Sequence, residues 1–85
     1  MAMLLNDQTF AIKDIYVPAK HRTRLDPANV QKIADSMLEV GQLTPILVRR
    51  DGERLVLVEG LHRLEACKAL GEKTIVGLLV RARPS

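Results

Sequence analysis

The sequence predicts a small α+β fold in which two main helices pack on a mixed sheet of about four strands. Two segments repeat apolar residues at helical spacing and end at Gly41 and Gly71, as helices commonly do. Around them lie short apolar runs typical of strands, and an Asp-Gly dipeptide separates two of these runs as in a hairpin. At 85 residues the chain has the length of one domain. We therefore expect a single domain over residues 1–85, with residues 1–8 as a loose leader.

The composition indicates a folded, mildly basic chain with few aromatic residues. Hydrophobic residues make up 47% of it, and Phe10 and Tyr16 are the only aromatic ones besides histidine. This scarcity argues against single-stranded nucleic-acid binding, which depends on aromatic stacking platforms. The formal net charge of +3 suits an anionic partner without requiring one. Because no apolar stretch approaches the ~18 residues of a membrane span and no signal peptide is apparent, we expect a cytoplasmic protein without a membrane partner.

The first third of the chain predicts a strand, a loop and a cluster of positive charge. Thr9–Ile12 is expected to form a short strand, and Asp14–Pro18 a loop with a small apolar anchor. A dense group of basic side chains follows from Lys20 to Arg24, on a segment that we expect to be irregular. Two interpretations remain open. The segment is either a solvated charged loop or a loop that folds over an anion site and supplies Arg22 or Arg24.

Asp26–Val40 has the pattern of one amphipathic helix. Asp26 offers an acceptor at the N-cap position, and Pro27 suits the first helical position, where no N–H is needed. Gly41 supplies the stop signal. The residues of this helix that we expect in the core are Val30, Ile33, Ala34, Met37 and Leu38.

The next segment has the pattern of a hairpin. Ile46–Arg50 and Arg54–Val58 are strand candidates, and Asp51-Gly52-Glu53 joins them with the Asp-Gly dipeptide at the turn. Both runs are so continuously apolar that we expect the sheet to be covered over much of both faces. Thr74–Val80 is the last strand candidate. We expect it to share one sheet with the hairpin, and both helices to pack on that sheet.

The function is best argued from Glu59–Gly71. A strand that passes through Gly60 into a helix places the free N–H groups of the helix at the edge of the sheet. These donors and the positive end of the helix dipole attract an anion such as phosphate. His62 and Arg63 fall in the first helical turn and can add charge or hydrogen bonds. The sequence therefore predicts a phosphate site at this turn.

Arg63 provides the sharper argument, because it starts from the inward face of this helix. It shares that face with Ala66, Cys67 and Leu70 at helical spacing. A buried guanidinium without a partner is costly. Arg63 therefore needs either a carboxylate of the chain, such as Glu59, or an anionic ligand. Spacing alone leaves both interpretations open.

No metal site and no disulfide are expected. Cys67 is the single cysteine, which excludes an internal disulfide and a multi-cysteine metal site. Its place on the apolar side of the helix predicts a buried, unreactive thiol. His21 and His62 have no spacing typical of metal ligands.

The segment Gly60-Leu61-His62-Arg63-Leu64-Glu65-Ala66 resembles the hallmark of the ParB/sulfiredoxin fold, a strand followed by Gly-x-x-Arg-x-x-Ala at the start of a helix. Leu25–Val40 and the following Gly41-Gln42-Leu43-Thr44-Pro45-Ile46-Leu47-Val48 resemble the ParB helix and the strand after it. The resemblance covers nearly the whole chain and points to the ParB N-terminal domain, also called the ParB-like nuclease domain. Sulfiredoxins have Gly-Cys-His-Arg, whereas Leu61 replaces that cysteine here, so sulfiredoxin chemistry is not expected.

The resemblance implies a nucleotide site. ParB partition proteins bind CTP with its phosphates over the helix N-terminus. The cofactor-binding residues that this implies here are Gly60, His62, Arg63, Arg22, Arg24, Gln42 and Thr44. The first three form the helix N-terminus, the next two match the upstream basic segment of the family, and the last two match a segment that borders the pocket. The expected cofactor is a nucleoside triphosphate, CTP or ATP, with or without Mg²⁺.

Three classes of function remain open. The first is a nucleotide-binding switch or accessory factor in plasmid or chromosome partition, or in DNA-linked regulation. The second is an enzyme that uses the nucleotide, a kinase or a weak nucleoside triphosphatase, with Glu59 as catalytic base or metal-binding carboxylate. The third is a nucleotide-independent protein in which Arg63 is structural and the basic residues bind DNA or a DNA-associated protein. A homodimer is compatible with each.

Overall fold

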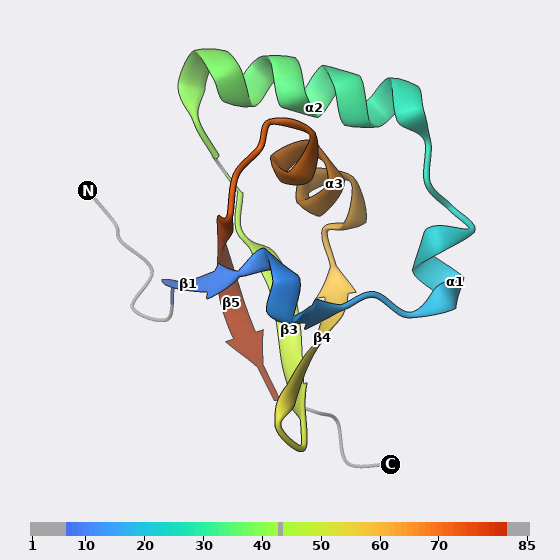
Figure 1. The fold of residues 1–85 in the computed structure, drawn as a ribbon, viewed down its shortest axis with the longest axis vertical. Helices are drawn as coiled ribbons and strands as arrows, with labels where there is room; N and C mark the ends of the chain where they lie inside the picture. The colour runs from blue at the N-terminus through green and yellow to red at the C-terminus, as the bar shows by residue number, and fades with distance from the viewer. Residues whose placement is uncertain (1–6, 43, 82–85) are drawn as a thin grey trace.

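The structure is a computed structural model that describes residues 7–42 and 44–81, and it confirms the α+β fold (Figure 1). In chain order the elements are β1 (Asp7–Ala11), the 3₁₀ helix η1 (Ile12–Asp14), β2 (Ile15–Tyr16), α1 (Ala19–Arg22), α2 (Pro27–Val40), β3 (Ile46–Asp51), β4 (Arg54–Glu59), α3 (Leu61–Ala69) and β5 (Thr74–Val80). One mixed sheet contains five strands in the order β1-β5-β3-β4-β2, where about four were predicted. β3 runs parallel to β5 and β2 runs parallel to β4, whereas the β1–β5 and β3–β4 pairs are antiparallel.

The N-terminal region contains more regular structure than the sequence predicts. β1 starts at Asp7, so the leader expected to run to residue 8 was predicted too long, and its residues 1–6 lie outside the described part. Ile12, predicted as the end of this strand, begins η1 instead. β2 lies within the expected loop Asp14–Pro18, and α1 occupies the basic segment predicted as irregular. These elements have two and four residues, too few for an apolar repeat to reveal either of them.

Both predicted helices are present, with the predicted end signals. Asp26 is the N-cap of α2, where its side chain accepts a hydrogen bond from the Ala28 N–H at 3.1 Å. Pro27 is the first helical residue. Gly41 follows α2 with a φ of +77°, and Gly71 follows the last turn of α3 with a φ of +78°. None of the helices in the described ranges combines the length and the apolar character that a membrane crossing requires.

The β3–β4 hairpin is confirmed, although its turn lies one residue later than predicted. Asp51 pairs with Arg54, which leaves Gly52 and Glu53 as the two turn residues. Gly52 has a φ of +65° and Glu53 does not have a positive φ, which matches a hairpin turn with glycine at its first central position. At the other end of the hairpin the register shifts, because Leu47 pairs with Glu59 and Val48 pairs with Leu57.

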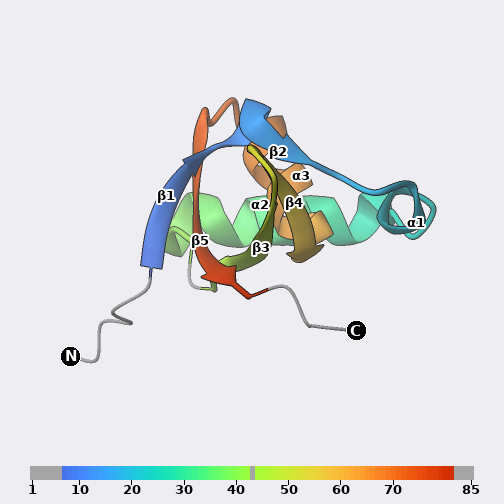
Figure 2. The ribbon, with the colours of Figure 1, turned by 90° about the horizontal axis from the view of Figure 1, so that it is seen from below.

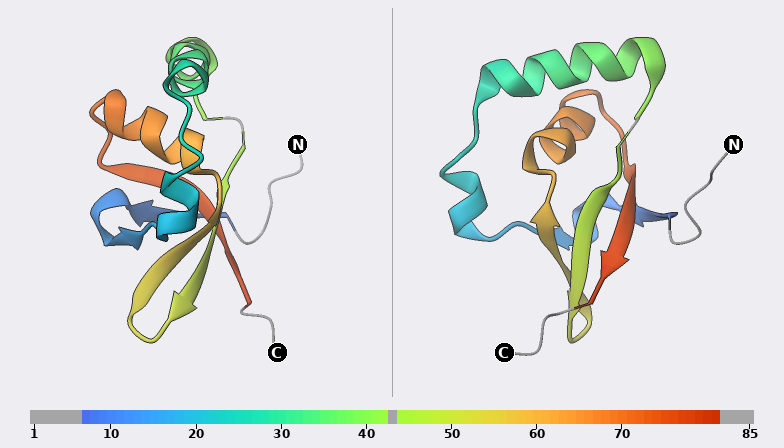
Figure 3. Two further views of the ribbon diagram at one scale, coloured as in Figure 1. Left: turned by 90° about the vertical axis from the view of Figure 1, so that its right-hand side faces the viewer. Right: turned by 180° about the vertical axis from the view of Figure 1, so that it is seen from behind.

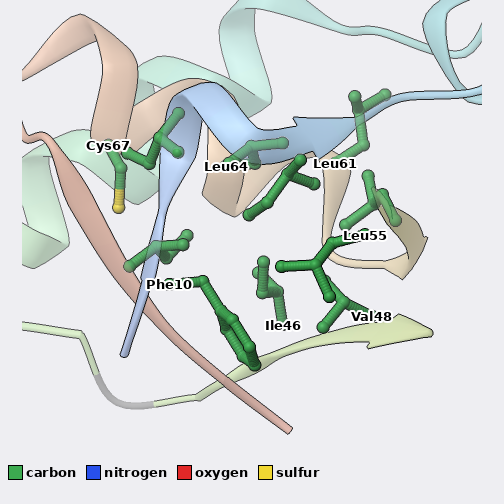
Figure 4. Close-up of a cluster of buried hydrophobic side chains, with 11 residues drawn as sticks. Phe10, Ile46, Val48, Leu55, Leu61, Leu64 and Cys67 are labelled. Atoms are coloured by element: carbon green, nitrogen blue, oxygen red, sulfur yellow. The ribbon is translucent and has the colours of Figure 1, made fainter. Parts of the chain in front are cut away.

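The core lies between one face of the sheet and α3 (Figure 4). Strand alternation points Ile46 and Val48 of β3 and Leu55 and Leu57 of β4 toward α3, and all four are buried. β1, η1, β2 and β5 close the core from the remaining sides. The buried residues that complete it are Phe10, Ile12, Ile15, Leu61, Leu64, Cys67 and Ile75.

The two helices are stacked, so that only α3 lies directly on the sheet. α2 packs mainly on α3, across the side of α3 that faces away from the strands (Figure 1). α2 buries Ala34 fully and reaches the core cluster through Met37. The prediction that Leu38 lies in the core is wrong, because 72% of its surface is exposed. One residue advances a helix by about 100°, and this rotation turns Leu38 away from the face that holds Met37.

The outer face of β5, β3 and β4 is open, which contradicts the prediction that both faces of the sheet are covered. No helix or strand of the described ranges lies over it (Figure 3, right). On this face Val58 is 37% exposed, and Leu47, Leu78 and Val80 are partly exposed, whereas Val56 of β4 is buried on the side of α1. The stacking of α2 on α3 leaves no helix for the second face. Figure 2 shows the curvature of the sheet, with β1 and α1 on opposite sides of the molecule.

Candidate functional site

The N-terminus of α3 is held against the sheet at Gly60. This residue has a φ of +112°, in the left-handed region that favours glycine. A Cβ at this position would lie 2.6 Å from Cγ2 of Ile46 and 2.9 Å from its Cβ, too close for any side chain. The register shift in the hairpin leaves Val58 without an opposite residue, and such a bulge bends the end of a strand. The bend and the glycine together bring the first turn of α3 close to the start of β3.

The first turn of α3 offers free hydrogen-bond donors. Gly60 is the N-cap residue and has no side chain, so no side chain caps the helix there. The first helical hydrogen bond joins the Leu64 N–H to the Gly60 carbonyl at 2.9 Å. The N–H groups that precede it in a helix have no partner within the helix, and the helix dipole adds positive potential at this end. This is the geometry that the sequence predicted for an anion site.

His62 joins the N-terminus of α3 to that of α2. Its Nε2 accepts a hydrogen bond from the backbone N–H of Asp26 at 3.0 Å. The lone pair of Nε2 is the acceptor in this bond. The contact places the positive ends of two helix dipoles side by side. The basic segment that precedes Asp26 is thereby connected to α3 through this residue.

Arg63 is half-buried between α3 and α2. It lines a small pocket of about 140 Å³ together with Ser36 and Met37 of α2, Gly41 and Thr44. Within the described ranges there are two ion pairs, Asp51 with Arg54 and Glu65 with Lys68, and neither includes Arg63. The alternative in which Arg63 pairs with Glu59 is therefore not formed in this structure. Among the described residues, the half-buried side chain of Arg63 therefore has no carboxylate partner.

Gln42 has a structural partner in β5. Its Nε2 donates to the Val76 carbonyl at 2.8 Å, and its Oε1 accepts from the Val76 N–H at 2.9 Å. Val76 lies one residue before the point at which β3 begins to pair with β5, so the amide of Gln42 continues the ladder in place of a strand. The same Nε2 also lies 2.9 Å from the Thr44 carbonyl. Gln42 thus holds in position the backbone of Thr44, which shares a pocket with Arg63.

The remaining predicted residues lie at the margin of this site. Arg22 ends α1 and Arg24 lies in the link to α2, and both are exposed. Neither lines the Arg63 pocket. Their nearest described connection to the site is through Asp26, which contacts His62. Glu59 is exposed at the end of β4, directly before Gly60.

The structure therefore brings the predicted residues together in two groups. Gly60, His62 and the N-terminus of α2 form one group, and Arg63 and Thr44 form the other. Sequence reasoning missed two members, the backbone N–H of Asp26 and the side chain of Ser36. Ser36 carried a signal, since it is a polar residue three positions after Ile33 on the face expected to pack inward. The contact of Asp26 with His62 had no signal in the sequence, because it joins residues 36 positions apart.

Cys67 lies one helical turn after Arg63 and is 2% exposed, which confirms the predicted burial. Burial raises the pKa of its thiol above the ordinary value of 9.0, and the nearby Glu72 carboxylate raises this pKa further. The positive charge of Arg63 acts in the opposite direction, more weakly. The thiol is therefore protonated at neutral pH. No group of three or more potential metal ligands occurs within the residues that the structure describes.

Comparisons with known proteins identify relatives of this chain. The sequence family described as the ParB N-terminal domain matches residues 5–84. The probable chromosome-partitioning protein ParB of Campylobacter jejuni is 34% identical over 62 residues, which cover 73% of this chain and 22% of that protein. The chain thus spans about a fifth of the length of the curated relatives that it matches.

Several solved structures share its fold, among them a sulfiredoxin and a ParB protein. Sulfiredoxin from Arabidopsis thaliana superposes with a TM-score of 0.81 at 25% identity, over 89% of this chain and 85% of that one. The C-terminally truncated chromosome-partitioning protein ParB from Caulobacter crescentus, complexed with CTP-gamma-S, superposes with a TM-score of 0.77 at 22% identity. That match covers 91% of this chain and 45% of the Caulobacter chain.

Proposed function

Because this chain belongs to the ParB N-terminal domain family, we propose that it binds a nucleoside triphosphate and holds the phosphates at the N-terminus of α3. CTP is the first candidate, since the Caulobacter ParB of the same fold is complexed with CTP-gamma-S, and ATP is the second. The module would act as a cytoplasmic switch or accessory factor in chromosome or plasmid partition. DNA, a DNA-associated protein or a second copy of the chain would be its macromolecular partner.

The observation that carries this proposal is the partial burial of Arg63 without an ion pair among the described residues. Its guanidinium is half-buried beside the first turn of α3, and neither described ion pair includes it. An arginine fork is suited to two phosphate oxygens at once. A phosphate at this place would provide the negative charge that the chain itself does not provide.

The other residues would have distinct tasks. Gly60 lets the backbone before α3 pack closely on Ile46, and the N–H groups of the first turn of α3 would donate to a phosphate. His62 would donate to the ligand through Nδ1 while Nε2 accepts from the Asp26 N–H. Thr44, positioned by Gln42, would border the ligand beside Arg63. The bound nucleotide would supply the negative charge of its phosphates, and Mg²⁺, when present, would neutralise part of that charge.

Arg22 and Arg24 would close the site from the α1–α2 link. Both side chains are exposed, and the link ends at Asp26, which contacts His62. A polyphosphate anchored at α3 would extend toward this positive charge. We therefore expect the link to become more ordered when the nucleotide binds.

Thermal unfolding of the wild-type chain and of Arg63→Ala tests the proposal. The melting temperature is measured with and without CTP, ATP and ADP, each with and without Mg²⁺. A ligand that binds only the folded state raises this temperature. A charge-assisted arginine–phosphate contact contributes about 1.5–3 kcal/mol, so Arg63→Ala should weaken binding by roughly ten- to a hundredfold. Arg63→Lys should restore only part of the affinity, because lysine lacks the fork.

Arg50→Ala is the matched control, because it removes the same charge from an exposed position on β3. Its affinity for the nucleotide should stay within about twofold of wild type, as screening reduces remote charges. The proposal fails if no nucleotide shifts the melting temperature of the wild-type chain. It fails equally if Arg50→Ala and Arg63→Ala weaken binding to the same extent, since binding would then depend on net charge alone. Phosphate release by wild type and by Glu59→Gln measures separately whether the nucleotide is hydrolysed.

A further inference from the structure

The open outer face of the sheet forms an apolar groove with a basic rim. The groove has a volume of about 800 Å³ and runs over β3, β4 and the end of β5, with α1 as one wall. Strand alternation explains its floor, because Leu47, Val56, Val58 and Val80 all point away from the core. Figure 3 (right) shows these strands without a covering element among the described residues.

Every charged residue that lines this groove is basic. Lys20 comes from α1, Arg49 from β3 and Arg81 from the position after β5. Among the described residues, no aspartate or glutamate belongs to the lining. The carboxylate of Asp51, which follows Arg49 on the same face of β3, is already paired with Arg54 at 3.2 Å. The positive charge of the rim is therefore not neutralised locally.

The apolar floor and the basic rim together indicate which class of partner fits the groove. Aliphatic side chains gain free energy when apolar groups displace water from them, and the rim attracts negative charge. A nucleic acid would supply the charge but not the aliphatic groups, and the described lining contains no phenylalanine, tyrosine or tryptophan as a broad stacking platform for bases. A protein segment that combines acidic and apolar side chains would satisfy both parts.

We propose that this groove, lined by Leu47, Arg49, Val58 and Arg81 among others, docks an acidic, amphipathic peptide segment of a partner protein. The apolar side chains of the segment lie on Leu47, Val58 and Val80, and its carboxylates face Lys20, Arg49 and Arg81. This surface belongs to the face of the sheet opposite α3. The proposal is therefore independent of the nucleotide proposed above, and each can fail without the other.

Peptide binding to the purified chain tests the proposal. The probe is a short fluorescein-labelled peptide in which Leu and Glu alternate, and the reference peptide has Lys in place of Glu. Fluorescence anisotropy should show saturable binding of the acidic peptide and at least about tenfold weaker binding of the basic one. Amide chemical-shift changes of the labelled chain should map to β3, β4 and Arg81 rather than to the first turn of α3.

Three variants locate the binding surface. Arg49→Glu and Arg81→Glu reverse charges of the rim, and Val58→Glu places a charge on the floor at a position without an opposite strand residue. Each substitution should lower the affinity for the acidic peptide by about tenfold or more. Leu38→Glu is the control, because it puts a charge on an exposed apolar residue of α2 outside the groove, and binding should stay within about twofold. Arg81 is exposed, so its variant tests the rim even if another variant unfolds.

Several results would overturn the proposal. These are no binding of the acidic peptide, equal binding of both peptides, or a loss of affinity in Leu38→Glu as large as in the three groove variants. Displacement of the peptide by saturating CTP or ATP would assign the groove to the nucleotide site instead. Tighter binding of duplex DNA through the same residues would make it a nucleic-acid surface. Concentration-dependent dimers that Val58→Glu abolishes in sedimentation velocity would make the occupant a second copy of the chain.

Discussion

Gly60 decides how the first turn of α3 meets β3. The residue combines a left-handed φ of +112° with the backbone and side chain of Ile46 in the place where a Cβ would go. These two constraints are independent, because one belongs to the backbone of residue 60 and the other to its neighbour. The position therefore tolerates neither a different backbone conformation nor a side chain.

We predict that Gly60→Ala lowers the free energy of unfolding by about 2–4 kcal/mol, from the left-handed φ and from overpacking against Ile46. Urea unfolding measures this change. Gly71→Ala is the control, since Gly71 has a similar φ of +78° but no atom within 4 Å of the built Cβ, and it should cost about 1 kcal/mol. Equal losses in the two variants would contradict the close contact with Ile46.

Cys67 provides a second prediction at the residue scale, about pH. Its pKa is raised in the folded chain, mainly by burial, so the folded state holds the proton more tightly than the unfolded state does. The resulting stability is fully present below pH 9.0, the ordinary pKa, and is lost as the pH rises through the raised pKa. Cys67→Ala should therefore show a smaller fall in the free energy of unfolding above pH 9.0 than wild type. Urea titrations on both sides of that pH, at equal ionic strength, measure the difference.

The native thiol should also react slowly. A thiol reagent should label Cys67 far more slowly in buffer than in denaturant, because the side chain is 2% exposed and its thiolate is disfavoured. Equal labelling rates in the two solvents would show that this side of α3 is not packed on the core.

At the scale of the elements, the start of α2 is the feature on which the site depends. Asp26 caps α2 with its side chain, and its backbone N–H donates to His62 of α3. One residue thus fixes the beginning of one helix and the position of another.

Asp26→Ala should lower the free energy of unfolding by about 1 kcal/mol, through loss of the cap, and Asp26→Asn should recover most of it. Asp35→Ala is the control on the same helix, because Asp35 is exposed and its described bond is to Gln31. The free energy of unfolding of Asp35→Ala should stay within about 0.5 kcal/mol of wild type. A cost for Asp35→Ala as large as that for Asp26→Ala would show that the cap contributes nothing specific.

At the scale of the whole molecule, Gln42 ties the end of α2 to the sheet. Its amide donates to the Val76 carbonyl and accepts from the Val76 N–H, in a part-buried position before the start of β3. Removing it leaves a backbone donor and a backbone acceptor without their partner.

We expect Gln42→Ala to lower the free energy of unfolding by about 2 kcal/mol and to speed hydrogen exchange of the Val76 amide. Gln42→Glu keeps the acceptor for that amide and loses the donor, so it should protect the Val76 N–H better than Gln42→Ala does. Gln31→Ala, at an exposed position of α2, is the control and should leave this amide unchanged. Unaltered exchange at Val76 in Gln42→Ala would rule out the proposed tie.

Part of the candidate site could be predicted from the sequence, and part depends on the tertiary structure. The turn of Gly60, His62 and Arg63 is contiguous in the chain, so a strand, a glycine and a helix predict its geometry. Thr44 and Arg63 are brought together only when the link before β3 passes α3. The functional role of each of these residues stays a prediction that the variants above test.

The sequence by itself determined the elements whose signals are local. The cap at Asp26, the glycines that end both helices and the paired strands of the hairpin depend on neighbouring residues, so they could be read without the fold. Tertiary structure decided whatever depends on distant partners. β2 exists because β4 provides its hydrogen bonds, Leu38 is exposed because α2 packs on α3, and the outer face of the sheet is open because both helices lie on one side. Burial and long-range pairing are properties of the assembled chain, and a periodic pattern states only which side chains share a face, not what covers that face.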